Sequence, residues 1–182
     1  MERIRGVTIT QARKLAAGVR PETANEEFAR LYRDHYRSVF RYVLVLTRNP
    51  EDAEVVAAEA FERAFAAWSQ GDLRRETALR WLLVAARRRA TDRWRRARRL
   101  LRLQGDSVGR VNDALRESES LLWLDEVLSL LPTRQREVLA LRYQQDLTDR
   151  DIAVVIDLSE SGVRSLVARA MATLRNHPEV WQ

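Results

Sequence analysis

The sequence predicts an all-α protein built from two small helical domains. Apolar residues recur at three- and four-residue steps along most of the 182-residue chain, which is the spacing of one helix face. No stretch alternates apolar and polar residues for long enough to form a β-strand. A chain of this length accommodates one domain or two small ones, and the glycine-containing segment 104–109 interrupts the helical pattern. We therefore expect a linker there, with one helical domain on each side.

The boundaries follow from these changes of pattern and charge. We expect a basic N-terminal arm at residues 1–21, a first helical domain at 22–99, a linker at 100–119, a second helical domain at 120–176 and a C-terminal tail at 177–182.

The first domain is expected to contain three helices. The first ends at Asn49-Pro50, a dipeptide typical of a helix boundary, and the second ends at Gly71. The third begins near Glu76. Each helix has one apolar stripe, and together the three stripes contain Phe28, Leu31, Tyr32, Tyr36, Val39, Phe40, Val43, Leu46, Ala53, Ala57, Ala60, Phe61, Ala64, Phe65, Trp68, Trp81, Leu82, Ala85, Ala86 and Ala90.

Capping residues and one tight turn organise the second domain. Thr133, Thr148 and Ser159 are each placed to cap a helix, with Asp151 three residues after Thr148. The last two helices meet at Asp157, and aspartate tolerates the positive φ of such a turn. The first of the three helices is expected to bury Val138, Leu141 and Tyr143. The spacing around the turn is that of a helix-turn-helix, given by Ile152, Ala153, Ile156, Leu158, Val163 and Leu166.

The second helix of this helix-turn-helix has a polar outer face. Arginine can donate two hydrogen bonds to a guanine edge, and serine can bond bases or phosphates, so the face suits a DNA major groove. The alternative is a helical hairpin that binds nothing. The candidate contact residues are Ser159, Glu160, Ser161, Arg164, Ser165, Ala168 and Arg169.

The third helix of the first domain becomes strongly basic toward its end. Nine arginines and one aspartate between residues 87 and 102 give a net charge of +8 over sixteen positions. Such a surface attracts a nucleic-acid backbone, and Trp94 among the arginines can stack on an unpaired base. The alternatives are a solvated helix face for the arginines and packing within the domain for Trp94.

The composition excludes several kinds of site. The chain has no cysteine, which excludes disulfides, thiolate nucleophiles and cysteine-bound zinc. Its two histidines, His35 and His177, are far apart, and no nucleotide-binding glycine loop is present, so we expect no enzymatic activity, no metal and no cofactor. No apolar run approaches the roughly 18 residues of a membrane span, and residues 1–20 lack a signal-peptide core. We expect a cytoplasmic protein without membrane insertion.

Taken together, these segments resemble the sigma-70 family of bacterial RNA polymerase sigma factors, and most of all its short two-domain extracytoplasmic function (ECF) group. The family's second region is similar to residues 28–96, with FARLYRDHYRSVFRYVLVLTRNPEDAEVVAAEAFERAFAAW and RWLLVAARRRATDRWRRARR. The fourth region is similar to residues 124–175, with LPTRQREVLALRYQQDLTDRDIAVVIDLSESGVRSLVARAMATLR. The two regions stand in the family's order, with a linker between them.

The resemblance implies a role for each segment. The −35 promoter element would be read as duplex DNA by the helix from Ser159 to Arg169, and an anti-sigma factor is implied as a partner by analogy alone. Core RNA polymerase would bind Asp52, Glu54, Glu59 and Arg63. The −10 element would be recognised and melted to single strands by Arg87, Arg88, Thr91, Asp92, Trp94, Arg95 and Arg96.

Two other functions stay open at this point. A stand-alone DNA-binding regulator with a sigma-like fold and weakened polymerase docking is favoured by Val55 and Ala58, which depart from the family's pattern on the expected docking surface. Such a regulator binds duplex DNA by itself, with a steep salt dependence. A helical interaction module whose basic face meets an acidic protein gives no DNA-dependent signal at low salt. The acids at residues 51–54 are also explained by the helix macrodipole alone.

Overall fold

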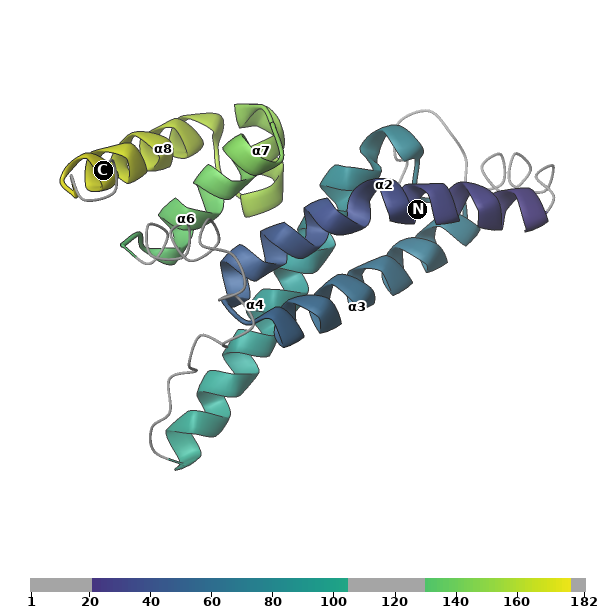
Figure 1. Cartoon of the computed structure of the whole chain (residues 1–182), viewed down its shortest axis with the longest axis horizontal. Helices are drawn as coiled ribbons and strands as arrows, with labels where there is room; N and C mark the ends of the chain where they lie inside the picture. The colour runs from purple at the N-terminus through teal and green to yellow at the C-terminus, as the bar shows by residue number, and fades with distance from the viewer. Residues whose placement is uncertain (1–20, 105–129, 178–182) are drawn as a thin grey trace, which may run out of the picture.

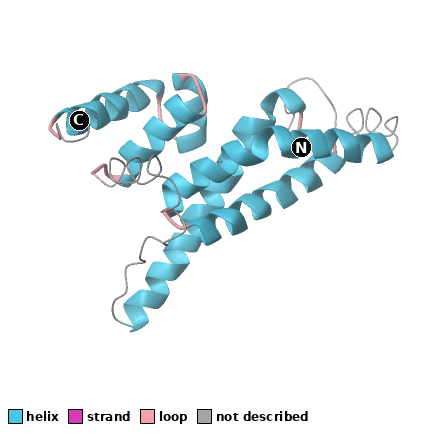
Figure 2. Cartoon of the chain, viewed as in Figure 1, coloured by secondary structure: helices cyan, strands magenta, loops and turns pink. Residues whose placement is uncertain are grey.

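The computed structural model of the chain describes residues 21–104 and 130–177, and every regular element in these two stretches is a helix (Figure 1, Figure 2). The first stretch contains α2 (Pro21–Thr47), α3 (Pro50–Ser69), the 3-10 helix η1 (Arg75–Thr77) and α4 (Ala78–Gln104). The second contains α6 (Thr133–Leu139), the π-helix η3 (Ala140–Gln144), α7 (Asp149–Ile156) and α8 (Glu160–Arg175). The predicted all-α fold is confirmed. The predicted arm, most of the linker, the start of the second domain and the end of the tail lie outside the described residues.

Helices α2, α3 and α4 pack on one another as a three-helix bundle (Figure 1). Most of the predicted stripe positions are buried, but Tyr32 and Phe65 are 40% and 44% exposed. Their rings lie at the edge of the bundle, where Phe65 meets Phe28 edge-on at 5.0 Å between ring centroids. Helix α4 continues to Gln104, past residue 99, where the sequence pattern placed the end of the domain.

The start of α3 is fixed by local chemistry. The side-chain oxygen of Asn49 accepts a hydrogen bond from the backbone N–H of Asp52 at 3.1 Å, and Pro50 occupies the first turn. Proline suits that position because its missing N–H has no partner inside the helix. The predicted helix boundary at Asn49-Pro50 is therefore confirmed, and its cause is an N-cap.

Removing this cap should destabilise the first domain. Asn49→Ala leaves the Asp52 N–H without its side-chain acceptor, so the free energy of unfolding should fall by about 1 kcal/mol. Urea denaturation followed by circular dichroism measures the change. The control Ser69→Ala, at the exposed end of α3, should stay within about 0.5 kcal/mol of the wild type. Equal stabilities of the two variants would contradict the role assigned to Asn49.

The helix-turn-helix forms as its sequence predicts. Thr148 and Ser159 cap α7 and α8 by accepting backbone N–H groups at 3.2 and 3.1 Å. Asp157 takes up the left-handed conformation, with φ of 56°, and ends α7. Thr133 does not cap α6 as predicted, because it already lies in the first helical turn, after Pro132. Its hydroxyl oxygen instead accepts a hydrogen bond from the Arg136 side chain at 3.4 Å.

A change of helix type explains one wrong burial prediction. Tyr143 was expected in the apolar stripe with Val138 and Leu141, but its exposed fraction is 66%. Residues 140–144 form a π-helix, which has more residues per turn than an α-helix. The wider turn shifts the register after Leu141 and rotates Tyr143 toward solvent.

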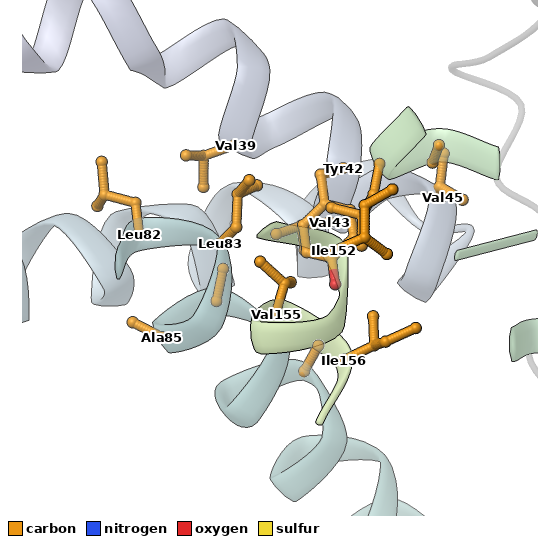
Figure 3. Packing of buried hydrophobic residues seen from close by; sticks show 14 of the residues in the cluster. Val39, Tyr42, Val43, Val45, Leu82, Leu83, Ala85, Ile152, Val155 and Ile156 are labelled. Atoms are coloured by element: carbon orange, nitrogen blue, oxygen red, sulfur yellow. The ribbon is translucent and has the colours of Figure 1, made fainter. Parts of the chain in front are cut away.

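The two predicted domains lie in direct contact. Helix α2 packs against α6 and η3, and α4 packs against α7. Figure 3 shows side chains from α2, α4 and α7 meeting in one apolar cluster, and Tyr42, Leu83 and Ile152 in it are fully buried. The hydrophobic core of the described residues is therefore continuous across the domain boundary.

Candidate nucleic-acid and polymerase interfaces

The basic half of α4 presents most of its predicted −10 residues to solvent. Trp94 has an exposed fraction of 57%, so it does not pack into the core of its own domain. Thr91 is half-buried at the edge of this surface. The fully exposed members are Arg88, Asp92, Trp94, Arg95 and Arg96. We call these five residues the α4 surface.

Arg87 lies apart from the α4 surface. Its guanidinium Nε donates a hydrogen bond to Glu137 Oε1 of α6 at 2.7 Å, and the Arg87 side chain is only 21% exposed. This predicted promoter contact is therefore neutralised by the second domain in the structure.

Two more arginines of α4 are neutralised by α3. Arg89 donates to Glu59 at 2.8 Å, and Arg93 donates to Asp52 at 2.7 Å. The hydrogen bond and the charge of Glu59 raise the pKa of Arg89. The sequence analysis did not single out Arg89 or Arg93, although their four-residue spacing places them on one face of the helix.

The residues predicted to bind RNA polymerase share one side of α3 with these ion pairs. Glu54 and Arg63 are exposed, whereas Asp52 and Glu59 are half-buried and held by the arginines of α4. Val55, which departs from the family's pattern, is 43% exposed beside them. The predicted polymerase-binding and −10-binding residues therefore lie on adjoining helices linked by two ion pairs.

Helix α8 presents all of its predicted −35 residues to solvent. Its inner side is closed by Val163, Leu166 and Ala170, which are at most 9% exposed. The outer side is a single polar face that no described element covers. Its members are Ser159, Glu160, Ser161, Arg164, Ser165, Ala168 and Arg169. We call these seven residues the α8 face.

Asp149 holds one arginine of the α8 face from behind. This first residue of α7 forms ion pairs with Arg142 and, at 3.7 Å, with Arg164, which also approaches Glu160 at 3.9 Å. Arg164 is therefore oriented by carboxylates on two helices. The sequence analysis missed Asp149 because its link to Arg164 crosses the turn between the helices, and no repeat in the sequence marks it.

The described residues offer little for other kinds of chemistry. Within residues 21–104 and 130–177, no group of three or more histidine, aspartate or glutamate side chains is placed to hold a metal ion. His35 is partly buried in α2, and this burial lowers its pKa, with the Asp34 carboxylate acting in the opposite direction. None of the helices in these two stretches has both the length and the apolarity that crossing a bilayer requires.

Both halves of the chain match profiles of one family. Residues 31–100 match the profile described as Sigma-70 region 2, and residues 121–174 match the profile described as Sigma-70, region 4. The chain belongs to the sigma-70 family. It is an RNA polymerase sigma factor, which directs transcription to specific promoters. The basic α4 and the helix-turn-helix of α7 and α8 lie in region 2 and region 4 of this sigma factor, respectively.

Several bacterial sigma factors are similar to this one along most of its length. The probable RNA polymerase sigma factor RfaY of Xanthomonas campestris pv. campestris is 30% identical over 83% of the chain, which spans 40% of that longer protein. The RNA polymerase sigma-E factor of Streptomyces coelicolor is 26% identical, with 82% of this chain and 84% of that protein covered. The ECF RNA polymerase sigma factor SigM of Bacillus subtilis is 26% identical, with 80% and 91% covered.

Solved structures share the fold of this sigma factor. The sigma factor RpoE from Bartonella quintana, solved with the anti-sigma factor NepR, aligns with a TM-score of 0.71 at 19% identity over 86% of this chain and 97% of that one. CnrH, solved with the cytosolic domain of CnrY, aligns with a TM-score of 0.63 at 22% identity over 94% and 96% of the two chains. At these identities the likeness concerns the fold alone.

Proposed function

We propose that this sigma factor reads a promoter with two separate surfaces, the α4 surface for the −10 element and the α8 face for the −35 element. The observation that carries the proposal is the exposure of both sets of residues while the apolar sides of the same helices are buried. Each helix is anchored by its own domain and leaves a polar side for a ligand. This arrangement suits one protein that contacts two sites on one DNA molecule.

The α4 surface suits melted DNA. Arg88, Arg95 and Arg96 place cationic groups around the exposed Trp94 ring. Arginines bind the phosphates of a single strand, and an aromatic ring stacks on an unpaired base. Because stacking requires a base outside the duplex, binding here favours the open state of the −10 element. Strand opening therefore needs no catalytic group, and the sigma factor acts without enzymatic activity of its own.

The α8 face suits a duplex. A helix fits the major groove of B-DNA, and residues near its N-terminus reach the base edges. Arg164 is held in place by Asp149 and Glu160, which reduces the rotamer freedom it would lose on binding. Ser161 and Ser165 flank it for contacts to bases or phosphates.

The exposed part of α3 is our proposed contact for core RNA polymerase. Glu54 and Arg63 are open to a partner, and Asp52 and Glu59 connect this contact to α4 through Arg93 and Arg89. Work with RNA polymerase places the protein in the cytoplasm. The titles of the two structures that share the fold name anti-sigma partners, which supports an inhibitory partner for this chain as well.

Run-off transcription with core RNA polymerase tests the proposed function. The template is a promoter found by mapping transcript starts after overexpression of the sigma factor. Transcription should require the sigma factor, and Glu54→Arg with Arg63→Glu should remove it by weakening core binding. The matched control Glu26→Arg with Arg30→Glu changes exposed charges at the start of α2 and should have no effect. Duplex binding without any complex with core polymerase would instead support a stand-alone regulator.

A further inference from the structure

We propose that the second domain inhibits the free sigma factor by docking on the first domain in a closed form that cannot span a promoter. The closed form is the arrangement of the structure, with α6 and α7 packed against α2 and α4 (Figure 1). The proposal rests on the functions proposed above for the α4 surface and the α8 face. Its centre is the contact of Tyr42, Arg87 and Glu137, which we call the interdomain cluster.

The interdomain cluster joins three helices through one carboxylate. Tyr42 of α2 donates its hydroxyl proton to Glu137 Oε1 at 2.7 Å, and Arg87 of α4 donates to the same oxygen at 2.7 Å. Tyr42 is fully buried, and the Glu137 side chain is 5% exposed. Both donors come from the first domain and the acceptor from the second, so the cluster exists only while the domains are docked.

The burial of Glu137 makes this contact specific. A carboxylate removed from water is strongly destabilised unless charged and hydrogen-bonding partners compensate it. Here the partners are Arg87 and Tyr42, and a domain docked in another register would leave Glu137 buried without them. The cluster therefore selects one mode of docking, even though an ion pair of this kind adds little net stability.

Apolar contacts supply the attraction between the domains. Figure 3 shows Val155 and Ile156 of α7 close to Ala85 of α4 and to the side chains of α2. Val155 is 2% exposed, although the helix-turn-helix spacing did not require it in the core. Separating the domains would expose part of this surface to water, which is unfavourable in proportion to the apolar area.

Two polar contacts extend the interface on either side of this core. Arg80 of α4 forms an ion pair with Asp151 of α7 at 2.8 Å, and Gln145 donates to the backbone oxygen of Ser38 at 3.0 Å. Gln145 is 9% exposed, so its amide is removed from water by α2. Asp151 has two roles, because it also accepts the hydroxyl proton of the cap residue Thr148 at 2.7 Å.

The closed form conflicts with promoter binding for two reasons. Arg87, a proposed −10 contact, is occupied by Glu137. In addition, the −10 and −35 elements are about 25 base pairs apart, which is roughly 80 Å of B-DNA. Helix α8 contacts α7, and α7 contacts α4; the 16 residues of α8 extend only about 24 Å. The two surfaces therefore cannot reach both elements until the domains separate.

Holding the domains together tests the inhibition directly. Because the chain has no cysteine, Arg80→Cys with Asp151→Cys introduces the only two thiols, one on each side of the interface. A short, cleavable thiol crosslinker should reduce run-off transcription at least about tenfold, and cleavage of the linker should restore it. The controls are the two single-cysteine variants treated with the same reagent, which should keep full activity.

The outcomes of this experiment separate the two proposals. Full transcription by the crosslinked protein would overturn the inhibitory role of the closed form and leave the proposed function intact. Absence of transcription by the untreated wild type with core polymerase would overturn the proposed function itself. Loss of activity in the single-cysteine controls would show that the introduced thiols block another surface, and would count against the interface.

Opening the closed form should have the opposite effect. Glu137→Lys places a like charge beside Arg87, so the open population should grow, and the core polymerase needed for half-maximal transcription should fall about tenfold. Small-angle scattering should show a larger radius of gyration. Glu26→Lys makes the same charge change on an exposed part of α2 and should change neither value. Tyr42→Phe is the milder second variant and should shift both in the same direction; no shift in either variant would refute the proposal.

Tyr42 also gives the closed form a pH dependence. Burial, followed by the charge and hydrogen bond of Glu137, holds the pKa of Tyr42 well above 10, and Arg87 opposes this. An open form would release the hydroxyl to water, with a pKa near the ordinary value of about 10. The closed form is thus fully favoured below pH 10 and loses its advantage as pH rises toward the raised pKa. Scattering at increasing alkaline pH should show expansion in the wild type and a weaker response in Tyr42→Phe; equal responses would contradict this assignment.

Discussion

Replacing Arg88, Arg95 and Arg96 together by alanine is expected to reduce run-off transcription by on the order of 100-fold or more, because each lost contact to a charged phosphate weakens binding by about 1.5 kcal/mol or more. The three side chains are exposed on one helix whose inner side is buried, so the substitutions leave the core untouched. The defect should appear in strand opening, measured by permanganate footprinting of unpaired thymines, and core polymerase binding should persist.

The salt dependence of binding provides a second measure of the same change. Three fewer phosphate contacts should lower the slope of log affinity for single-stranded −10 DNA against log salt by about 2. The control replaces Arg30, Arg37 and Arg41, which are exposed on α2, and removes the same net charge. If the control reduced opening as much as the α4 variant, the effect would come from overall charge and the assignment of α4 would be wrong.

Arg164→Ala is expected to reduce transcription about 10- to 100-fold from a promoter whose −35 element matches the sigma factor, since a good arginine–guanine contact is worth about 1–3 kcal/mol of discrimination. Arg164 is the arginine of the α8 face that Asp149 and Glu160 hold. The measurement compares run-off from the native template with run-off from templates carrying single changes in the −35 element. One base pair should lose its influence in the variant.

Arg175→Ala is the matched control for this substitution. Arg175 lies exposed in the last turn of α8, outside the α8 face, and its loss should leave the template preferences unchanged. A uniform loss across all templates in Arg164→Ala would identify Arg164 as a phosphate contact, and the specific base contact would then be refuted.

The closed form connects these predictions to regulation. Arg87 stands four residues before Thr91 on the basic helix, yet its partner in the structure is Glu137. Opening of the domains releases Arg87 and allows the α4 surface and the α8 face to separate. A ligand shifts such an equilibrium only through better binding to the open form, and a partner that prefers the closed form would inhibit.

The local signals in the sequence predicted the helix-turn-helix and the first bundle well. Asn49, Thr148 and Ser159 cap their helices, and Asp157 makes the turn between α7 and α8. Each of these interactions joins residues within four positions of one another, so the sequence pattern contains both partners. The outward direction of the α8 face follows in the same way, because the apolar stripe of a helix fixes its opposite side.

The sequence by itself determined the helices, the turn and the two charged surfaces of this sigma factor, because these depend on neighbouring residues and on periodicity. Only the tertiary structure decided the contacts between helices. Tyr42 lies off the apolar stripe of α2, and Glu137 is a charged residue, yet both are buried where the two domains meet. Partners 95 positions apart leave no periodic signal, since their distance depends on how whole helices pack.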